Sequence, residues 1–212
     1  MERSADTLHE APVWSAWLRF THWASALAVL VALATGWLMT LAPAISVREA
    51  HVSAGYGLAL ALAVRVYLLL FGRRAEHWRD LRPTSGHAVA ATLRFYLTLG
   101  RAPLPGWYAH NPLWSPLYVL LWLLLAGALA TGAARLYPAL GAFLPGDWHA
   151  PLARAVAVWC GLHVVAVVLH DLRGATADIS GMINGRRLFR LRPPPGGAEV
   201  PLRDLLGPRE RR

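Results

Sequence analysis

Four long apolar segments, separated by more polar ones, dominate the pattern of this chain. They run over about residues 13–41, 49–72, 114–136 and 148–172. Each is long enough for an α-helix that crosses the hydrocarbon core of a bilayer, which needs roughly 20 apolar residues. The pattern therefore predicts an all-α fold, an integral membrane four-helix bundle in which successive helices alternate in direction.

Polar segments at the two ends and in the middle complete the predicted organisation. The domains are a polar N-terminal lead over 1–12, a transmembrane domain over 13–176 and a basic tail over 177–212. The lead has no apolar core followed by a cleavage site, so we expect the first apolar segment to stay as an anchor. We expect the lead and the end of the tail, from PPPGG onward, to lack regular structure.

The long central loop is expected to contain one helix of its own. Thr84 and Ser85 are candidate caps for a helix over 84–99. Apolar residues such as Val89, Phe95 and Tyr96 recur along it. Such a helix would lie along the membrane surface.

The composition supports a membrane protein and predicts its orientation. Hydrophobic residues make up 56% of the 212 residues and charged residues only 16%, too apolar a balance for an ordinary soluble domain. The net charge of +9 comes from arginine, since the chain has no lysine. These arginines flank the apolar segments, in the 72–113 loop and the tail, which argues against a nucleic-acid partner. The positive-inside rule places both termini and the loop in the cytoplasm.

Histidines at matched depths are the strongest candidates for chemistry. The fourth apolar segment carries His149, His163 and His170. His149 and His163 are almost four helical turns apart, so both leave one face, about 21 Å from each other along the axis. Because the helices alternate in direction, His51 reaches the outer depth of His149 and His22 reaches the inner depth of His163. We therefore predict two pairs, outer His51/His149 and inner His22/His163.

Paired imidazoles on facing helices suit a six-coordinate haem iron, which takes one axial ligand on each side. A closed zinc site usually needs four nitrogen or sulfur ligands, and no cluster of cysteines and carboxylates supplies them. The single Cys160 is expected to be a small core residue. A transporter or assembly scaffold that uses Arg65 and the histidines for proton handling is a remote alternative.

Three further residues are expected to contact such a haem. Gly36 is fourteen residues after His22, at outer depth, where a missing side chain would let a flat macrocycle approach the backbone. Arg65 is fourteen residues after His51, at inner depth, and Arg19 lies one turn before His22. Arginine in a membrane helix usually has an anionic partner, and a haem propionate would be one.

Several motifs resemble those of nickel–iron hydrogenase-type b cytochromes. They are RFTHW at 19–23, ATG at 34–36, HVSAGYGLALALAVR at 51–65, AHNP at 109–112 and SGMINGR at 180–186. The spacing of His149, His163 and His170 is also similar to that of bacterial cytochrome b561 proteins. The resemblance covers roughly residues 13–187.

The resemblance implies a multi-pass subunit of the bacterial cytoplasmic (inner) membrane that holds two b-type haems. His22 and His163 would ligate the inner iron, and His51 and His149 the outer one. Electrons would pass between the quinone pool and a redox partner, which is a hydrogenase, another dehydrogenase or a c-type cytochrome. The main alternative is a stand-alone enzyme that oxidises superoxide or another small reductant and reduces quinone.

His170 has several possible roles. It shares the face of His163 but lies about 10 Å closer to the cytoplasm. It is a candidate to replace His163 as ligand, or to bind a propionate or a quinone oxygen, and we favour a role beside the ligands or at a quinone site. Of the other histidines, His9 belongs to the lead, and His77, His87 and His110 are expected in loops or at the surface. An exposed apolar helix face could accommodate a second copy in a homodimer.

Overall fold

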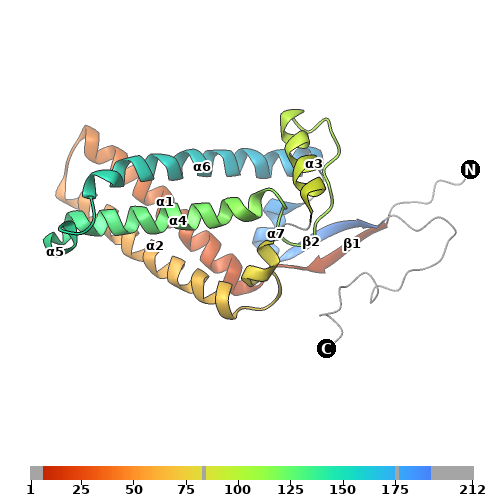
Figure 1. Ribbon diagram of the computed structural model, residues 1–212, viewed down its shortest axis with the longest axis horizontal. Helices are drawn as coiled ribbons and strands as arrows, with labels where there is room; N and C mark the ends of the chain where they lie inside the picture. The colour runs from red at the N-terminus through yellow and green to blue at the C-terminus, as the bar shows by residue number, and fades with distance from the viewer. Residues whose placement is uncertain (1–6, 83–84, 175–176, 192–212) are drawn as a thin grey trace, which may run out of the picture.

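Four long helices form the body of the molecule (Figure 1). The computed structural model describes residues 7–82, 85–174 and 177–191. The four helices are α1 (Ala16–Leu41), α2 (Ile45–Phe71), α4 (Trp114–Leu136) and α6 (His149–Leu169). All four are long and apolar enough to cross a membrane. The predicted membrane four-helix bundle is therefore confirmed.

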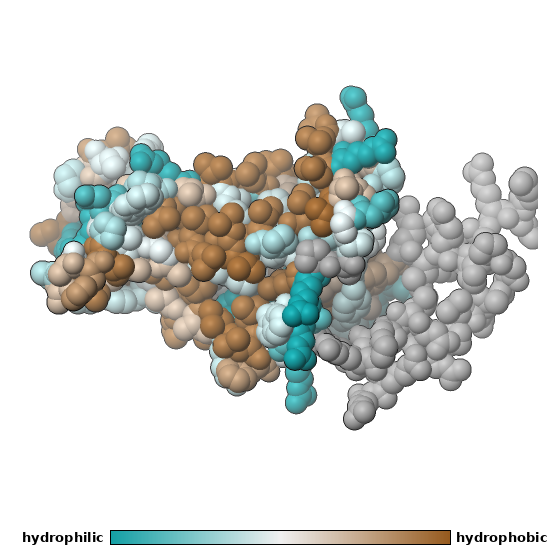
Figure 2. Space-filling view, viewed as in Figure 1, coloured by the Kyte–Doolittle hydropathy of each residue, from teal (hydrophilic) through white to brown (hydrophobic). Residues whose placement is uncertain are grey.

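Apolar side chains cover the middle of the face shown in Figure 2, and polar ones gather toward its two ends. Large hydrophobic residues are exposed along all four helices, and Trp17 and Trp37, near opposite ends of α1, are each 64% exposed. A soluble protein rarely exposes so much apolar surface. Surrounded by lipid, the same surface is favourable, and the tryptophans lie where aromatic belts are found.

Shorter elements cover both ends of the bundle. At the connector end, where α1 leads into α2, lie α5 (Pro138–Gly141) and η3 (Gly146–Trp148). At the opposite, terminal end lie β1 (Thr7–Pro12), η1 (Arg74–Glu76), η2 (Trp78–Leu81), α3 (Gly86–Leu97), η4 (His170–Gly174), α7 (Asp178–Asn184) and β2 (Arg186–Leu191). The η4 segment is one π-helical turn that continues α6.

The lead and the tail pair with each other at the terminal end. β1 and β2 are antiparallel, from Thr7 opposite Leu191 to Pro12 opposite Arg186. The expectation that the lead lacks regular structure is wrong for Thr7–Pro12, because the tail supplies its ladder partners. The backbone then enters α1 through hydrogen bonds from the amides of Val13 and Trp14 to the Gly185 carbonyl. The PPPGG stretch lies outside the described residues.

The helix expected over 84–99 is α3. Ser85 caps it, because its Oγ accepts a hydrogen bond from the Ala88 amide at 3.1 Å, while Thr84 lies outside the described residues. Phe95 of α3 is only 1% exposed, and its ring lies 5.8 Å from that of His170. The apolar side of α3 therefore packs against the end of α6 and does not only face lipid.

The bundle is organised in three layers, with one residue from each spanning helix in each layer. The connector-end layer contains Gly36, His51, Gly132 and His149, the middle layer Val29, Leu58, Leu125 and Val156, and the terminal-end layer His22, Arg65, Tyr118 and His163. Within every helix the three positions are seven residues apart, so they share nearly one face at intervals of about 10 Å. The middle layer is one buried apolar cluster, so it separates the two layers that carry polar groups.

Two helical hairpins make up this bundle. α1 packs mainly against α2, and α4 mainly against α6, while contacts between the hairpins are fewer. Both predicted histidine pairs combine a ring from the first hairpin with one from the second. A ligand held by these pairs would join the hairpins.

Candidate functional site

His51 and His149 face each other in the connector-end layer, with ring centroids 5.9 Å apart. The Nδ1 atom of His51 lies 2.9 Å from the Ala32 carbonyl oxygen, and that of His149 lies 2.8 Å from the Ala128 carbonyl oxygen. A carbonyl only accepts, so Nδ1 carries the proton and Nε2 keeps a free lone pair. A histidine that binds a metal is typically anchored in this way through its other ring nitrogen.

A short internal repeat supplies both anchoring carbonyls. The sequence ALATG occurs at 32–36 in α1 and again at 128–132 in α4. Its first residue is Ala32 or Ala128, whose carbonyl binds the neighbouring histidine. Only the first copy contributed to the prediction of the histidine sites, through Gly36. The exact recurrence of five residues was the signal that could have revealed the second copy.

The glycine that ends each repeat lies against the anchored ring. A Cβ atom added to Gly36 would lie 3.4 Å from Cε1 of His51, and one added to Gly132 would lie 3.0 Å from Cε1 of His149. The missing side chains thus leave room for the imidazoles. These contacts concern the histidine rings, so the closer approach of a macrocycle to the backbone at Gly36 stays a prediction.

A cavity of about 750 Å³ opens beside this histidine pair. Its inner end is formed by the four middle-layer residues, and its lining includes His51, His149 and Gly132. Most of the remaining lining is alanine, valine and leucine, and the polar residues besides the histidines are Arg48, Tyr56, Arg135 and Tyr137. A pocket of this size, mostly apolar with a few polar groups, is typical of a small-molecule or cofactor site.

The second pair, His22 and His163, lies in the terminal-end layer with ring centroids 6.3 Å apart. Trp159 stacks on His163 at 5.1 Å, and Trp114 meets it edge-on at 5.5 Å. The Nδ1 atom of His163 is buried without a hydrogen-bond partner. This pair is therefore positioned by aromatic packing, whereas backbone carbonyls hold the other pair.

The distances between the rings fit one metal ion between each pair. Metal–imidazole bonds are about 2 Å long, and a ring centre lies about 1 Å beyond its nitrogen, so two imidazoles on one metal have centroids about 6 Å apart. Among the described residues, no group of three or more His, Cys, Asp or Glu side chains could hold a metal. Two protein ligands suffice for a metal that brings its own equatorial nitrogens, as haem iron does.

The two arginines predicted near the inner pair have protein partners. Arg65 donates from Nη1 to the Glu76 carbonyl at 3.0 Å, and its guanidinium lies 4.6 Å from the centre of the Trp122 ring. Arg19 donates to the carbonyl of Ile183 at the end of α7, and its Nε is buried without a partner. Arg65 belongs to the terminal-end layer, while Arg19 joins α1 to α7.

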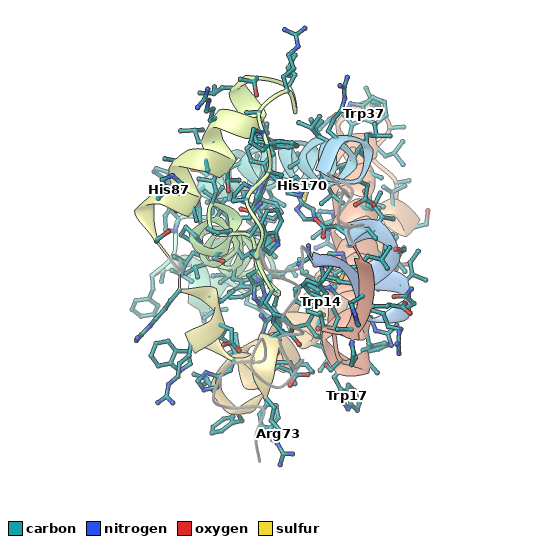
Figure 3. All side chains as sticks on the ribbon, turned by 90° about the vertical axis from the view of Figure 1, so that its right-hand side faces the viewer. Trp14, Trp17, Trp37, Arg73, His87 and His170 are labelled. Carbon is teal, nitrogen blue, oxygen red and sulfur yellow. The ribbon has the colours of Figure 1, made fainter. Side chains whose placement is uncertain are left out.

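His170 is the centre of a buried polar network. It is 3% exposed, and it lies toward the interior of the terminal end, whereas His87 lies at the periphery (Figure 3). Its Nδ1 is 3.0 Å from a carboxylate oxygen of Asp178, and its Nε2 is 2.5 Å from the Tyr96 hydroxyl. Both ring nitrogens are therefore engaged by side chains within the protein.

The network extends from His170 in two directions. Asp178 also binds Arg187, whose Nη2 lies 2.8 Å from the second carboxylate oxygen. On the other side, the Tyr96 hydroxyl accepts a hydrogen bond from Nε1 of Trp114 at 2.6 Å. Burial raises the pKa of Tyr96 to about 12, so its hydroxyl keeps its proton at physiological pH. Through Trp114, the network reaches the ring of His163.

His110 lies in a loop, as expected, and its side chain is partly enclosed rather than fully exposed. Its ring lies 5.2 Å from Trp14 and 6.0 Å from Tyr118, and its Nδ1 is buried without a partner. Burial, helped by the positive charges of Arg65 and Arg187, lowers the pKa of His110 to about 3. Nothing local marks this residue, since only the return of the loop onto the bundle encloses it.

Known proteins resemble the chain over nearly all of its described length. The family model for prokaryotic cytochrome b561 matches residues 13–185. A probable Ni/Fe-hydrogenase B-type cytochrome subunit of Azotobacter chroococcum is 30% identical, over 89% of this chain and 91% of that protein. One of the same name from Bradyrhizobium diazoefficiens is 27% identical, over 86% of each chain. No solved structure matches the chain.

Proposed function

Because the chain belongs to the prokaryotic cytochrome b561 family, we propose that this bacterial inner-membrane b-type cytochrome holds two haems and carries electrons between a redox partner and quinone. The observation that carries the proposal is the pair of facing imidazoles in each of two layers, 5.9 Å and 6.3 Å between centroids. When bound, haem supplies an iron that takes up and releases one electron. His51 and His149 hold one iron, and His22 and His163 hold the other.

The protein's own groups prepare each site. The carbonyls of Ala32 and Ala128 keep Nδ1 protonated in the outer pair, which leaves Nε2 as the atom that would hold an iron. The middle layer places four buried apolar side chains between the two sites. The guanidinium groups of Arg65 and Arg19 are the cations available to the carboxylates of the inner haem, and Nε of Arg19 has no hydrogen-bond partner in the described structure.

The orientation follows from charge. Arginines are concentrated at the terminal end, so this end faces the cytoplasm and the connector end faces outward. Relatives named as hydrogenase cytochrome subunits support a hydrogenase as the redox partner, docking at the outward end. Quinone then reacts near the inner pair, where His170 and Tyr96 carry exchangeable protons beside Trp114 and His163.

His170 is not an iron ligand in this proposal, because Asp178 and Tyr96 engage both of its nitrogens. It positions Tyr96 and gives quinone chemistry at this end a proton carrier. Replacing His170 should therefore leave both haems in place and slow electron transfer to quinone.

Spectroscopy of the purified protein tests the proposal. We expect two haems per chain and two midpoint potentials in a redox titration. His51→Ala or His149→Ala should remove one centre, His22→Ala or His163→Ala the other, and exposed His87→Ala should retain both. A protein without b-type absorption, or one that keeps both haems when His149 and His163 are both replaced, would contradict it.

The partner is tested separately by purification in mild detergent. A conduit should co-purify with a soluble redox subunit and reduce quinone only in its presence. Turnover of superoxide or another small reductant by the isolated chain would instead favour a stand-alone quinone reductase.

A further inference from the structure

Two arginines line the cavity beside the outer histidine pair toward its connector end, which we call the rim. Arg48 and Arg135 both line it, one from each helical hairpin. Arg48 lies three residues before His51 on α2, and Arg135 lies three residues after Gly132 on α4. Since these helices run in opposite directions, both arginines are one turn, about 4.5 Å, further toward the connector end than the histidine layer. One arginine from each hairpin therefore lies at the same depth along the bundle.

The charge distribution makes these cations unexpected. Most arginines of the chain gather at the terminal end, as the positive-inside rule requires, and arginine at the other end opposes that bias. Among the described residues, neither Arg48 nor Arg135 forms an ion pair with a carboxylate. Glu49 is next to Arg48 in the chain and lines an adjoining opening of about 320 Å³, but it forms no ion pair with Arg48. The carboxylates of the described part of the chain therefore do not neutralise these two charges.

Local packing holds the rim in place. A Cβ atom added to Gly146 of η3 would lie 2.8 Å from Cγ of Arg135, so this glycine leaves room for the arginine's stem. The hydroxyls of Tyr56 and Tyr137 are 2.6 Å apart and join α2 to the end of α4. One of these two hydroxyl protons is used between them, and the other is left to donate.

We propose that Arg48 and Arg135 form a carboxylate-binding rim that holds the propionates of the outer haem. The inference rests on the proposed function, since it takes the cavity's occupant to be haem. Haem is an apolar disc with two carboxylates at one edge, and the cavity is apolar with two cations at one edge. Arginine binds carboxylates through paired hydrogen bonds, and its positive charge disfavours the ferric state, which carries one charge more.

The test is a redox titration in the His22→Ala background, which retains only the outer haem. Arg48→Gln and Arg135→Gln should each lower its midpoint potential, shifting the redox equilibrium up to about tenfold, or about 59 mV for one electron. Arg154→Gln is the matched control, because Arg154 lies in the outer half of α6 without lining the cavity. Arg48→Lys and Arg135→Lys keep the charge and should keep most of the potential.

The outcomes separate this inference from the proposed function. Haem loss confined to the glutamine variants of Arg48 and Arg135 would support the rim as clearly as the shift in potential. Potentials equal to that of Arg154→Gln would overturn it, as would lysine variants that fall as far as the glutamine ones. A parent protein without haem would instead contradict the proposed function.

Discussion

At the scale of single residues, Gly132 decides how His149 can be held. Its Cα faces the imidazole so closely that an added Cβ would lie 3.0 Å from Cε1 and 3.2 Å from Nδ1. The ring cannot retreat freely, because Nδ1 is hydrogen-bonded to Ala128 at 2.8 Å. The glycine and the carbonyl therefore fix the ring together.

We expect Gly132→Ala to disturb the outer haem site because the ring must move by a few tenths of an ångström. Gly36→Ala should act more weakly, since its Cβ would make an ordinary 3.4 Å contact with His51, and Gly57→Ala should be silent because nothing lies within 4 Å. Haem content and the outer midpoint potential measure the series. Equal behaviour of all three variants would contradict it.

The partly enclosed His110 makes stability depend on pH. Its pKa falls from 6.5 in the unfolded chain to about 3 in the fold, so its stabilising effect is complete above pH 6.5 and is lost progressively as the pH falls toward 3. In this window the unfolded chain binds the proton and the folded protein does not. At pH 5 the loss approaches about 2 kcal/mol.

We therefore expect His110→Gln to remove part of the acid sensitivity. Relative to the parent, the variant should gain up to about 2 kcal/mol between pH 7 and pH 5, measured by thermal unfolding in detergent. Exposed His87→Gln serves as the comparison. A parallel decline of parent and His110→Gln over this range would show that His110 is not the responsible group.

At the scale of elements, α7 fastens the tail to the start of α1. Trp23 donates from Nε1 to the Met182 carbonyl at 2.9 Å, and Arg19 donates to Ile183. Gly185, which ends α7, has φ +86°, and an added Cβ would lie 2.7 Å from the Trp14 carbonyl oxygen. The SGMINGR motif thus has a structural role at this junction.

Replacing Gly185 by alanine should loosen this junction. A non-glycine residue at positive φ costs about 1–2 kcal/mol, and the contact with Trp14 adds to it. We expect a lower unfolding temperature and faster proteolysis of the tail, with haem content little changed. Gly106→Ala, where nothing lies within 4 Å, is the control. Equal protease resistance of the two variants would contradict the docking role.

At the scale of the whole molecule, the cofactor sites join two hairpins that share few direct contacts. Each histidine pair takes one ring from either hairpin, and the middle layer is the main apolar contact between them. A ligand that binds only the folded state stabilises it by mass action. Haem should therefore contribute much of the stability of this bundle.

Haem depletion should lower the unfolding temperature and expose the loop between the hairpins, residues 72–113, to protease. Adding haem back should restore both properties in the parent protein. It should fail in the variant that lacks His149 and His163, which keeps the same helices without the ligands. If the depleted parent is as resistant as the loaded one, the hairpins hold together without haem.

The sequence by itself determined the four spanning helices and the faces that they turn inward. Both are local properties, since hydropathy decides which segments leave water and the period of 3.6 residues decides which positions share a face. The alternating direction of successive helices put His51 at the depth of His149 and His22 at the depth of His163, and the rings of each pair lie side by side in the structure. Spacing by fourteen residues also placed Gly36 and Arg65 in the correct layers.

Only the tertiary structure decided which partners these residues have. The pairing of Thr7–Pro12 with Arg186–Leu191, the enclosure of His110 and the bonds of His170 to Asp178 and Tyr96 join segments far apart in the chain. Their formation depends on where loops return onto the bundle, which no local period encodes. Depth along a helix can be counted from the sequence, whereas the direction and hydrogen-bond partner of each ring follow from packing between helices.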